Sequence, residues 1–281
     1  MDFKEKFEKN VRETIRKYNL IKKKDKLIVA CSGGKDSTTV LYLLKKLGYN
    51  VEALTIDLLI GNYSKKNLEN IKIFCKDKKI KLNIINIRKE FGGSICYIRN
   101  IIQSKKKMSN CTICGVIKRW LINKKSRELK ANKIVTGHNL DDEAENILLN
   151  LFKGNPELSI NLGPKTGSIN DQKFVARIKP LYFCRNEDVK KYSRLMKFPV
   201  LYEPCPCSTE VFRRKIRKNL TELEKNRKNT KENIVKKFLN ILPQLKNKYK
   251  NKKELKYCKI CREPSRNEIC KTCELMKILK E

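Results

Sequence analysis

The sequence lacks any long, uncharged apolar run. No stretch approaches the roughly 18–20 apolar residues that a membrane span requires, and residues 1–5 do not begin the apolar core of a signal peptide. These absences predict a cytoplasmic protein with no membrane partner. Because the cytoplasm is reducing, the twelve cysteines are not expected to form disulfides, and grouped cysteines are expected to be metal ligands or redox-active thiols.

Acidic residues are scarce relative to basic ones. The chain has 30 Asp and Glu against 66 Lys and Arg, which gives a formal net charge of +36. Such an excess indicates a polyanionic partner, which is most simply a nucleic acid. The alternative is that the lysine-rich composition reflects a biased genome or heat adaptation, with lysines spread over solvated faces.

Short apolar segments alternate with helical ones in the first half of the chain. Strands are predicted at residues 27–30, 51–56, 82–87 and 133–137, and helices at 3–19, 36–47, 64–78, 141–152 and after Cys114. This alternation predicts an α/β fold with a doubly wound parallel sheet. Ligands of such sheets bind beyond the carboxyl ends of the strands.

The second half of the sequence predicts a loop, a last strand and a basic helical region. Glycines and prolines mark a loop at 154–175, followed by a strand at 200–202 and a helix at 209–226. Residues 213–256 hold 17 Lys and Arg against 4 Asp and Glu. They form either a solvated face or, as we favour, a surface for a nucleic-acid backbone. We therefore expect an N-terminal basic helix (1–25), a nucleotide-binding domain (26–210), a basic helical region (211–256) and a terminal cysteine module (257–281).

A phosphate-binding loop is predicted between the first strand and the helix after it. It consists of Ser32, Gly33, Gly34, Lys35, Asp36 and Ser37. The glycines let free backbone N–H groups approach an anion, Lys35 and the hydroxyls contact phosphates, and Asp36 is suited to hold Mg²⁺. The spacing differs from Gly-x-x-x-x-Gly-Lys-Ser/Thr and resembles the PP-loop of the ATP pyrophosphatase superfamily, which breaks the α–β bond of ATP and leaves AMP on the substrate.

The fourth predicted strand ends in a second polar motif at the same edge of the sheet. Residues 137–142 read Gly-His-Asn-Leu-Asp-Asp, and His138 is the only histidine of the chain. One interpretation makes His138 a structural cap. Contact with a nucleotide, with the carboxylates at a helix N-terminus, fits the pattern better.

Three cysteines are expected to meet near this edge. Cys111 and Cys114 form a Cys-x-x-Cys pair beside a helix, and Cys205 lies on a loop that is able to fold back to them. Three thiolates suit a [4Fe-4S] cluster with one open iron, whereas structural zinc normally has four protein ligands. The neighbouring Cys207 is an alternative ligand, a persulfide-carrying thiol or a buried residue. Cys31, Cys75, Cys96 and Cys184 are expected to be small core residues.

Four further cysteines form a terminal metal motif. Cys258-x-x-Cys261 and Cys270-x-x-Cys273 provide two pairs of thiolates, which together satisfy tetrahedral Zn²⁺. So small a module has no core of its own, so the metal is expected to supply its folding free energy.

These motifs together resemble the TtcA/TtuA-type tRNA 2-thiouridine synthetases. The resemblance covers nearly the whole chain and includes the phosphate loop, Cys111 and Cys114 with Lys118 after them, residues 137–144, the Cys-Pro-x-Ser segment at Cys205 and the terminal Cys₄ module. It implies that ATP adenylates the 2-oxygen of a tRNA uridine. It also implies that sulfur comes from a ubiquitin-like carrier or from free sulfide and is held at the open iron.

The resemblance also implies roles for single residues. The cluster ligands would be Cys111, Cys114 and Cys205. ATP would contact the phosphate loop and five further positions, which are Ala30, Ile56, Lys118, Gly137 and Asp141. Cys207 stands where the family usually has an aromatic residue, and residues 1–30 lack the cysteines of the family's usual N-terminal finger. Dimers are common in the family, so a homodimer is possible.

We therefore expect an ATP-, Mg²⁺- and iron-sulfur-dependent tRNA uridine 2-sulfurtransferase with a zinc module. Two alternatives stay open: a PP-loop tRNA cytidine thiolase, and a zinc-containing RNA-binding or assembly factor with a degenerate nucleotide site. The thiolated tRNA position and the sulfur donor are open as well.

Overall fold

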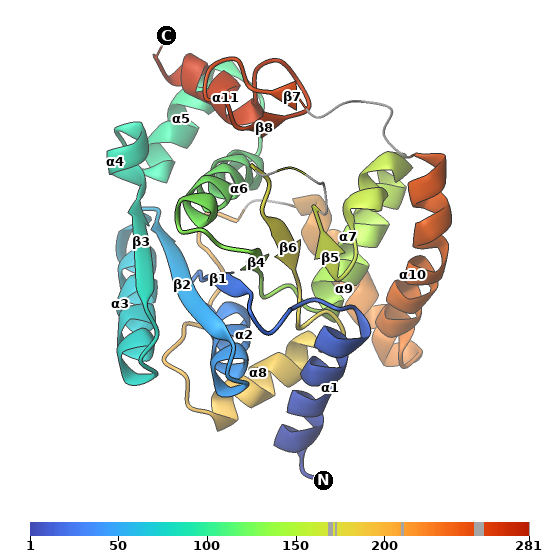
Figure 1. The fold of residues 1–281 in the computed structure, drawn as a ribbon. Helices are drawn as coiled ribbons and strands as arrows, with labels where there is room; N and C mark the ends of the chain where they lie inside the picture. The colour runs from blue at the N-terminus through green and yellow to red at the C-terminus, as the bar shows by residue number, and fades with distance from the viewer. Residues whose placement is uncertain (168–170, 172, 209–210, 250–255, 281) are drawn as a thin grey trace.

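A six-stranded, mainly parallel sheet forms the centre of the protein (Figure 1). The computed structural model describes residues 1–167, 171, 173–208, 211–249 and 256–280. The strand order is β3-β2-β1-β4-β6-β5, in which β5 runs antiparallel to β6 and the other neighbours are parallel. The strands are β1 (Lys26–Ala30), β2 (Asn50–Asp57), β3 (Leu82–Asn86), β4 (Lys133–Val135), β5 (Lys165–Thr166) and β6 (Ala176–Ile178).

Helices cover both faces of the sheet and extend beyond its β5 edge (Figure 1). They are α1 (Phe3–Lys17), α2 (Lys35–Lys46), α3 (Gly61–Asp77), α4 (Ile87–Phe91), α5 (Ile95–Lys105), α6 (Asn110–Glu128), α7 (Leu140–Phe152), α8 (Asn186–Leu195), α9 (Val211–Asn226), α10 (Thr230–Lys248) and α11 (Lys271–Lys280), with a 3₁₀ turn η1 (Pro156–Asn161). None of these helices, within the described ranges, is long and apolar enough to cross a membrane.

The central strand β1 is buried on both faces, which explains the doubly wound arrangement. Leu27 and Val29 point into a core formed with α1, α2, α3 and α8, while Ile28 points into a second core formed with α5 and α6. All three side chains are fully buried. Successive side chains of a strand point to opposite faces, so a continuous apolar run needs cover on both sides. The predicted α/β parallel sheet is confirmed.

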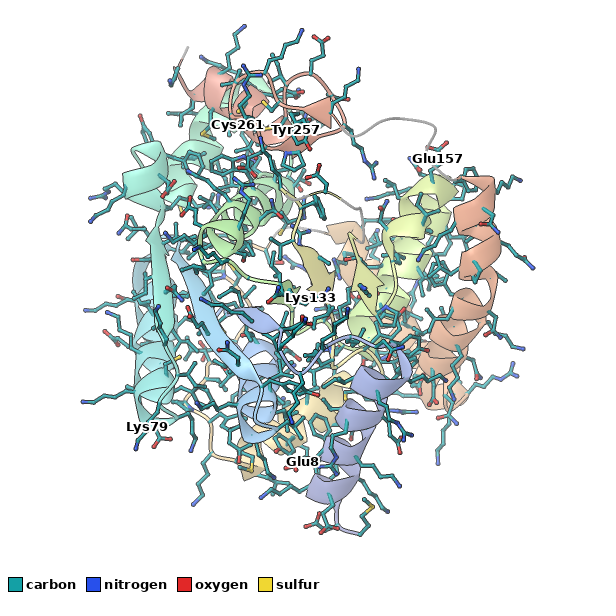
Figure 2. All side chains as sticks on the ribbon, in the orientation of Figure 1. Glu8, Lys79, Lys133, Glu157, Tyr257 and Cys261 are labelled. Carbon is teal, nitrogen blue, oxygen red and sulfur yellow. The ribbon has the colours of Figure 1, made fainter. Side chains whose placement is uncertain are left out.

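The N-terminal helix α1 belongs to the first core. Asp2 caps it by accepting the Glu5 amide, and Phe7, Val11 and Ile15 face inward. Glu8, labelled in Figure 2, is buried and accepts hydrogen bonds from Lys46 Nζ and Tyr192 Oη, both at 2.7 Å. Satisfied in this way, the carboxylate joins α1 to α2 and α8.

Three expectations about the elements need correction. Residues 200–202 do not form a strand, because pairing there is limited to one isolated bridge between Leu201 and Gly34, and Tyr202 is exposed. Helix α6 begins at Asn110, before Cys111 rather than after Cys114, because Ser109 caps it by accepting the Thr112 amide. The segment 154–175 contains η1 and β5, and β6 follows it.

Candidate nucleotide and cysteine sites

The residues of the predicted phosphate loop join β1 to α2 at the carboxyl edge of the sheet. Gly33 has φ +80°, and a Cβ there would lie 2.7 Å from the carbonyl oxygen of Asn67 on α3. Ser37 Oγ accepts the amide of Ser32 at 3.2 Å and donates to the carbonyl of Gly34 at 3.1 Å. These bonds hold the loop as a tight cradle at the N-terminus of α2, where free amides and the helix dipole attract an anion.

The end of β4 presses against this cradle. A Cβ on Gly137 would lie 2.7 Å from the carbonyl carbon of Asp36 and 2.8 Å from the amide nitrogen of Ser37. Asn139 caps α7 and donates through Nδ2 to Asp36 Oδ1 at 3.0 Å. The structure therefore brings together two motifs that lie about one hundred residues apart in the chain.

The charged residues of the loop already have partners in this structure. Lys35 Nζ donates to both carboxylate oxygens of Asp36, at 2.7 and 2.8 Å, and to Asn186 Oδ1 at 2.6 Å. The ammonium group therefore lies at the N-terminus of α2, next to the amides that would receive phosphate.

Asn139 links two carboxylates at this edge of the sheet: its Nδ2 donates to Asp36 Oδ1 at 3.0 Å and its backbone amide donates to Asp142 Oδ2 at 3.3 Å. Surrounding protein atoms, and then the charges of Asp36 and Glu145, raise the pKa of Asp142 to about 6. Carboxylate oxygens are the ligands that Mg²⁺ prefers, and it binds next to substrate phosphates. Sequence reasoning missed Asp142 as a site residue, although its motif was visible.

Asp141, which the sequence analysis assigned to ATP, makes structural contacts. Its carboxylate accepts Lys231 Nζ at 2.5 Å and the backbone amide of Asn186 at 2.7 Å. These bonds join α7 to α10 and α8. A role for Asp141 in binding ATP stays a prediction.

His138 follows β4, and several cationic side chains lie around it. Its Nδ1 is 2.8 Å from Thr136 Oγ1. Although the His138 side chain is exposed, the surrounding protein and then the charges of Lys179, Arg213, Arg177 and Lys118 lower its pKa. The imidazole is therefore neutral at pH 7, and the cations around it suit a polyphosphate. The short strand β6, which contributes Arg177, gave no clear sequence signal.

Helix α6 and the loop after Glu203 bring the predicted cluster cysteines to one side of the crevice. Cys111 and Cys114 lie three residues apart in the first turns of α6, so they share a face. Asn110 Nδ2 donates to the carbonyl of Cys207 at 3.3 Å, which holds the Cys205 loop against α6. Burial raises the pKa of Cys205, nearby Cys207 and Cys114 thiolates raise it further, and Lys118 lowers it.

The spacing of these thiols differs from that of a single-ion site. In the part of the chain that the structure describes, the four terminal cysteines have all their sulfur atoms within 4.8 Å of one another. Cys111, Cys114 and Cys205 do not form such a group. A [4Fe-4S] cluster with one open iron takes three thiol ligands, which is the number that Cys111, Cys114 and Cys205 provide.

Cys96 is not the core residue that the sequence predicted. It is half-buried, and Arg99 Nη2 lies 3.1 Å from its sulfur and 3.3 Å from that of Cys207. Cys31, Cys75 and Cys184 are buried, as predicted.

The terminal cysteines form a compact four-thiol site, whose Cys261 is labelled in Figure 2. The sulfur atoms of Cys258, Cys261, Cys270 and Cys273 all lie within 4.8 Å of one another. Burial opposes ionisation of Cys258, yet backbone amides, including those of Cys261 and Cys270, lower its pKa to about 6, whereas burial raises the pKa of Cys270 to about 11. Four thiolates this close need a cation between them, and Zn²⁺ fits the donor set.

This terminal module is docked on the main domain. It consists of β7 (Lys256–Tyr257), β8 (Pro264–Ser265) and α11, and Leu275 of α11 is fully buried against α5 and α6. Glu263 is buried and both its carboxylate oxygens contact Arg127 of α6, one at 2.8 Å from Nη1. The module is therefore held against α5 and α6 of the main domain.

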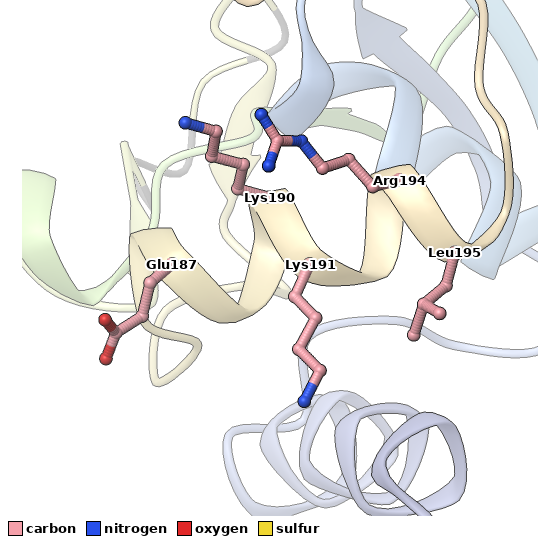
Figure 3. A pocket seen from close by; sticks show the side chains of 5 residues that line it. All are labelled: Glu187, Lys190, Lys191, Arg194 and Leu195. Carbon is pink, nitrogen blue, oxygen red and sulfur yellow. The ribbon is translucent and has the colours of Figure 1, made fainter.

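A hollow of about 390 Å³ lies elsewhere, on the outer face of α8 (Figure 3). Its lining comes from one helix and consists of Glu187, Lys190, Lys191, Arg194 and Leu195. It contains neither loop glycines nor cysteines, so it does not belong to the nucleotide or cysteine sites.

Comparisons with known proteins agree with this geometry. Residues 3–224 match the PP-loop domain family. The chain is 38% identical over 283 residues to a tRNA-5-methyluridine(54) 2-sulfurtransferase of Pyrococcus horikoshii, covering 99% of this chain and 87% of that protein. It is 34% identical over 278 residues to the Thermotoga maritima protein of the same name, covering 98% and 88%. Its structure is similar to the U34-tRNA thiolase NcsA of Methanococcus maripaludis with its [4Fe-4S] cluster, with a TM-score of 0.80 and 28% identity over 99% of this chain and 88% of that one.

Proposed function

The chain belongs to the PP-loop family of tRNA 2-sulfurtransferases, and we propose that its crevice adenylates a tRNA uridine while its three-cysteine site supplies the sulfur. One observation carries the proposal: helix α6 joins the two sites. It presents Cys111 and Cys114 in its first turns and Lys118 one turn later. The charge of Lys118 acts to lower the pKa of both Cys205 and His138, which supports placing the sulfur and nucleotide sites beside the same helix.

ATP is proposed to bind at the carboxyl ends of β1, β2 and β4. The amides of residues 32–37, with Lys35, receive the phosphates, and Gly137 closes the cradle. Ala30 and Ile56, at or next to the ends of β1 and β2, border the space proposed for adenosine. Asp36 and Asp142 are the carboxylates that would hold Mg²⁺, which would supply positive charge beside the phosphates.

The reaction has two displacements at this crevice. The 2-oxygen of uridine attacks the α-phosphorus of ATP, and pyrophosphate departs. Hydrosulfide then adds to carbon 2, and AMP departs with the oxygen. The cations around His138 stabilise the charge that develops on the phosphates, and neutral His138 is able to accept a hydrogen bond from the nucleotide.

Cys111, Cys114 and Cys205 are the proposed ligands of a [4Fe-4S] cluster. Three thiols leave one iron with an open position, which supplies a binding place for the incoming sulfur. The protein contributes the half-buried setting, which raises the pKa of Cys205, and the ammonium of Lys118, which partly opposes that rise. Free sulfide and a ubiquitin-like carrier are the proposed donors, and the homodimer stays a prediction.

The tRNA partner fits the basic helices. Lys215 and Lys218 of α9 are exposed, whereas Arg213 and Arg217 of the same helix bind the buried Glu145 at 3.0 and 2.6 Å. The arginines therefore secure α9, and the exposed lysines are left for phosphates. A cytoplasmic location fits a tRNA substrate.

Two measurements test the function. Mass spectrometry of tRNA nucleosides from a deletion strain should show loss of 2-thiouridine, and mapping of the digest identifies the position. Unchanged tRNA in the deletion strain would refute the proposal. Anaerobic protein should contain iron and inorganic sulfide that Cys111→Ala loses and the buried control Cys184→Ala keeps; zinc without iron would refute the cluster.

A further inference from the structure

Cys96 and Cys207 share one buried guanidinium beside the cluster site. Cys96 is the second residue of α5, and Cys207 lies two residues after Cys205. Arg99 Nη2 is 3.1 Å from the sulfur of Cys96 and 3.3 Å from the sulfur of Cys207. Arg99 is only 7% exposed, so α5 and the loop that holds Cys207 are joined through a buried cation, although Arg99 and Cys207 lie 108 residues apart in the chain.

The surroundings of Arg99 are made of sulfur rather than of carboxylates. Among the described residues, no Asp or Glu oxygen lies within ion-pair distance of it, and its Nε is buried without a hydrogen-bond partner. The acceptors that Arg99 Nη2 meets are the sulfur atoms of Cys96 and Cys207. A buried guanidinium is stabilised by an anionic partner, and the side chains within its reach here can provide one only as sulfur species.

This arrangement suits a thiol that carries an extra sulfur atom. A persulfide extends the side chain by one atom and adds a second sulfur that is able to accept a hydrogen bond. Arg99 offers further N–H donors, its buried Nε among them, so it is able to bind an additional sulfur anion. The second thiol within reach of the same guanidinium provides the nucleophile needed to release that sulfur.

We propose that Cys207 is a persulfide site and that Cys96 is its resolving thiol, so that the pair passes sulfur to the neighbouring three-cysteine site. This inference rests on the proposed function for the destination of the sulfur. The donor is a persulfide, R–S–SH, from a small molecule or a protein.

The sulfur balance has two steps. Cys207–SH attacks the outer sulfur of R–S–SH, which gives Cys207–S–SH and R–SH. Cys96–SH then attacks the inner sulfur of Cys207, which forms a Cys96–Cys207 disulfide and releases the outer sulfur as H₂S. A dithiol reductant restores both thiols and is itself oxidised to a disulfide. Sulfide supplied directly needs neither step.

The experiment uses the full-length protein with its cluster loaded, cysteine persulfide and sodium sulfide as separate donors, and the variants Cys207→Ser, Cys96→Ser and Cys184→Ser. After anaerobic exposure to cysteine persulfide and alkylation, peptide mass spectrometry should find a Cys96–Cys207 disulfide in the wild type and the Cys184→Ser control. In Cys96→Ser it should find one added sulfur on Cys207. Neither product should form in Cys207→Ser.

The tRNA assay separates this relay from the main reaction. Cys207→Ser and Cys96→Ser should lose persulfide-driven thiolation and retain sulfide-driven thiolation, because neither thiol is a proposed cluster ligand. The relay is overturned if Cys207 gains neither an added sulfur nor a disulfide. Persulfide-driven thiolation that persists in Cys207→Ser also overturns it. Loss of bound iron in Cys207→Ser also overturns it, since Cys207 would then be a ligand. If the wild type fails to thiolate tRNA with either donor, the proposed function is wrong. The peptide measurement still decides the relay in that case.

Discussion

Gly137 lies so close to Asp36 that a Cβ at this position would come within 2.7 Å of the Asp36 carbonyl carbon. The atom that it would meet is backbone, which has no flexible end to move aside. Gly137→Ala should therefore push β4 away from the phosphate cradle. We expect destabilisation of about 1–3 kcal/mol and ATP binding weakened about tenfold or more, which is ~1.4 kcal/mol.

Calorimetric titration with ATP checks this prediction, with Gly115→Ala as its control. A Cβ on Gly115 would meet the mobile guanidinium of Arg119 at 3.0 Å, and an alanine in a helix gains about 0.5–1 kcal/mol over glycine. The control should bind ATP normally. Normal ATP affinity in Gly137→Ala would contradict the close packing of β4 on the loop.

Asp142 should give a pH-dependent effect on stability. Because its pKa is raised to about 6, its contribution to folding is present at low pH and is lost as the pH rises through about 6. Asp142→Asn removes the charge that faces Asp36, so at pH 7.5 without Mg²⁺ it should raise the free energy of unfolding by roughly 1–2 kcal/mol. This gain should vanish near pH 4.

The same substitution should weaken the response to Mg²⁺ and ATP. Wild type should gain thermal stability from the two ligands together, and Asp142→Asn should gain less, because one cation ligand is gone. Asp77→Asn changes a carboxylate with 64% of its side chain exposed and should behave as wild type. An equal ligand-induced shift in melting temperature for all three proteins would remove Asp142 from the cation site.

The ion pair between Arg127 and Glu263 should hold the terminal module in place. Glu263→Gln leaves Arg127 without its carboxylate in a buried contact, at a cost of about 3 kcal/mol. Limited proteolysis should then release the terminal module more readily. Glu268→Gln breaks an exposed pair with Lys259, which solvent screens, and should leave stability nearly unchanged. Equal protease resistance in the two variants would argue against an anchoring role for Glu263.

Zinc removal should unfold the terminal module without emptying the cluster site. Cys258→Ser removes one of four thiols and should abolish bound zinc, measured by elemental analysis, while iron is retained. Loss of both metals in this variant would show that the two sites depend on each other.

The exposed lysines of α9 should determine how tRNA binding depends on salt. Lys215→Ala and Lys218→Ala should each lower the log–log slope of affinity against salt by about 0.7–0.9 if each contacts one phosphate. Arg217→Ala should instead lower stability, because Glu145 is buried and loses a partner. Salt-independent binding would show that the net charge of +36 reflects a compositional bias and not a tRNA-binding surface.

Much of the fold was predictable from local patterns. Residues 27–30 are apolar at every position, which indicates a strand covered on both faces, and the glycines after it mark the loop. The strand predicted at 200–202 was wrong because a short apolar run does not reveal whether a neighbouring strand is available to pair with it. The two residues of β5 carry too little pattern to be recognised.

The sequence by itself determined the chemistry of the protein: a phosphate loop at a strand end, a Cys-x-x-Cys pair, a four-thiol module and a large positive charge. Local motifs suffice for this because each is a short run whose side chains act together. Only the tertiary structure decided which distant residues meet. It linked Asp142 to Asp36 through Asn139 while Asp141 bonds to Lys231, and it placed Cys96 across Arg99 from Cys207. Such contacts depend on how helices pack against the sheet, and packing is a property of the whole chain.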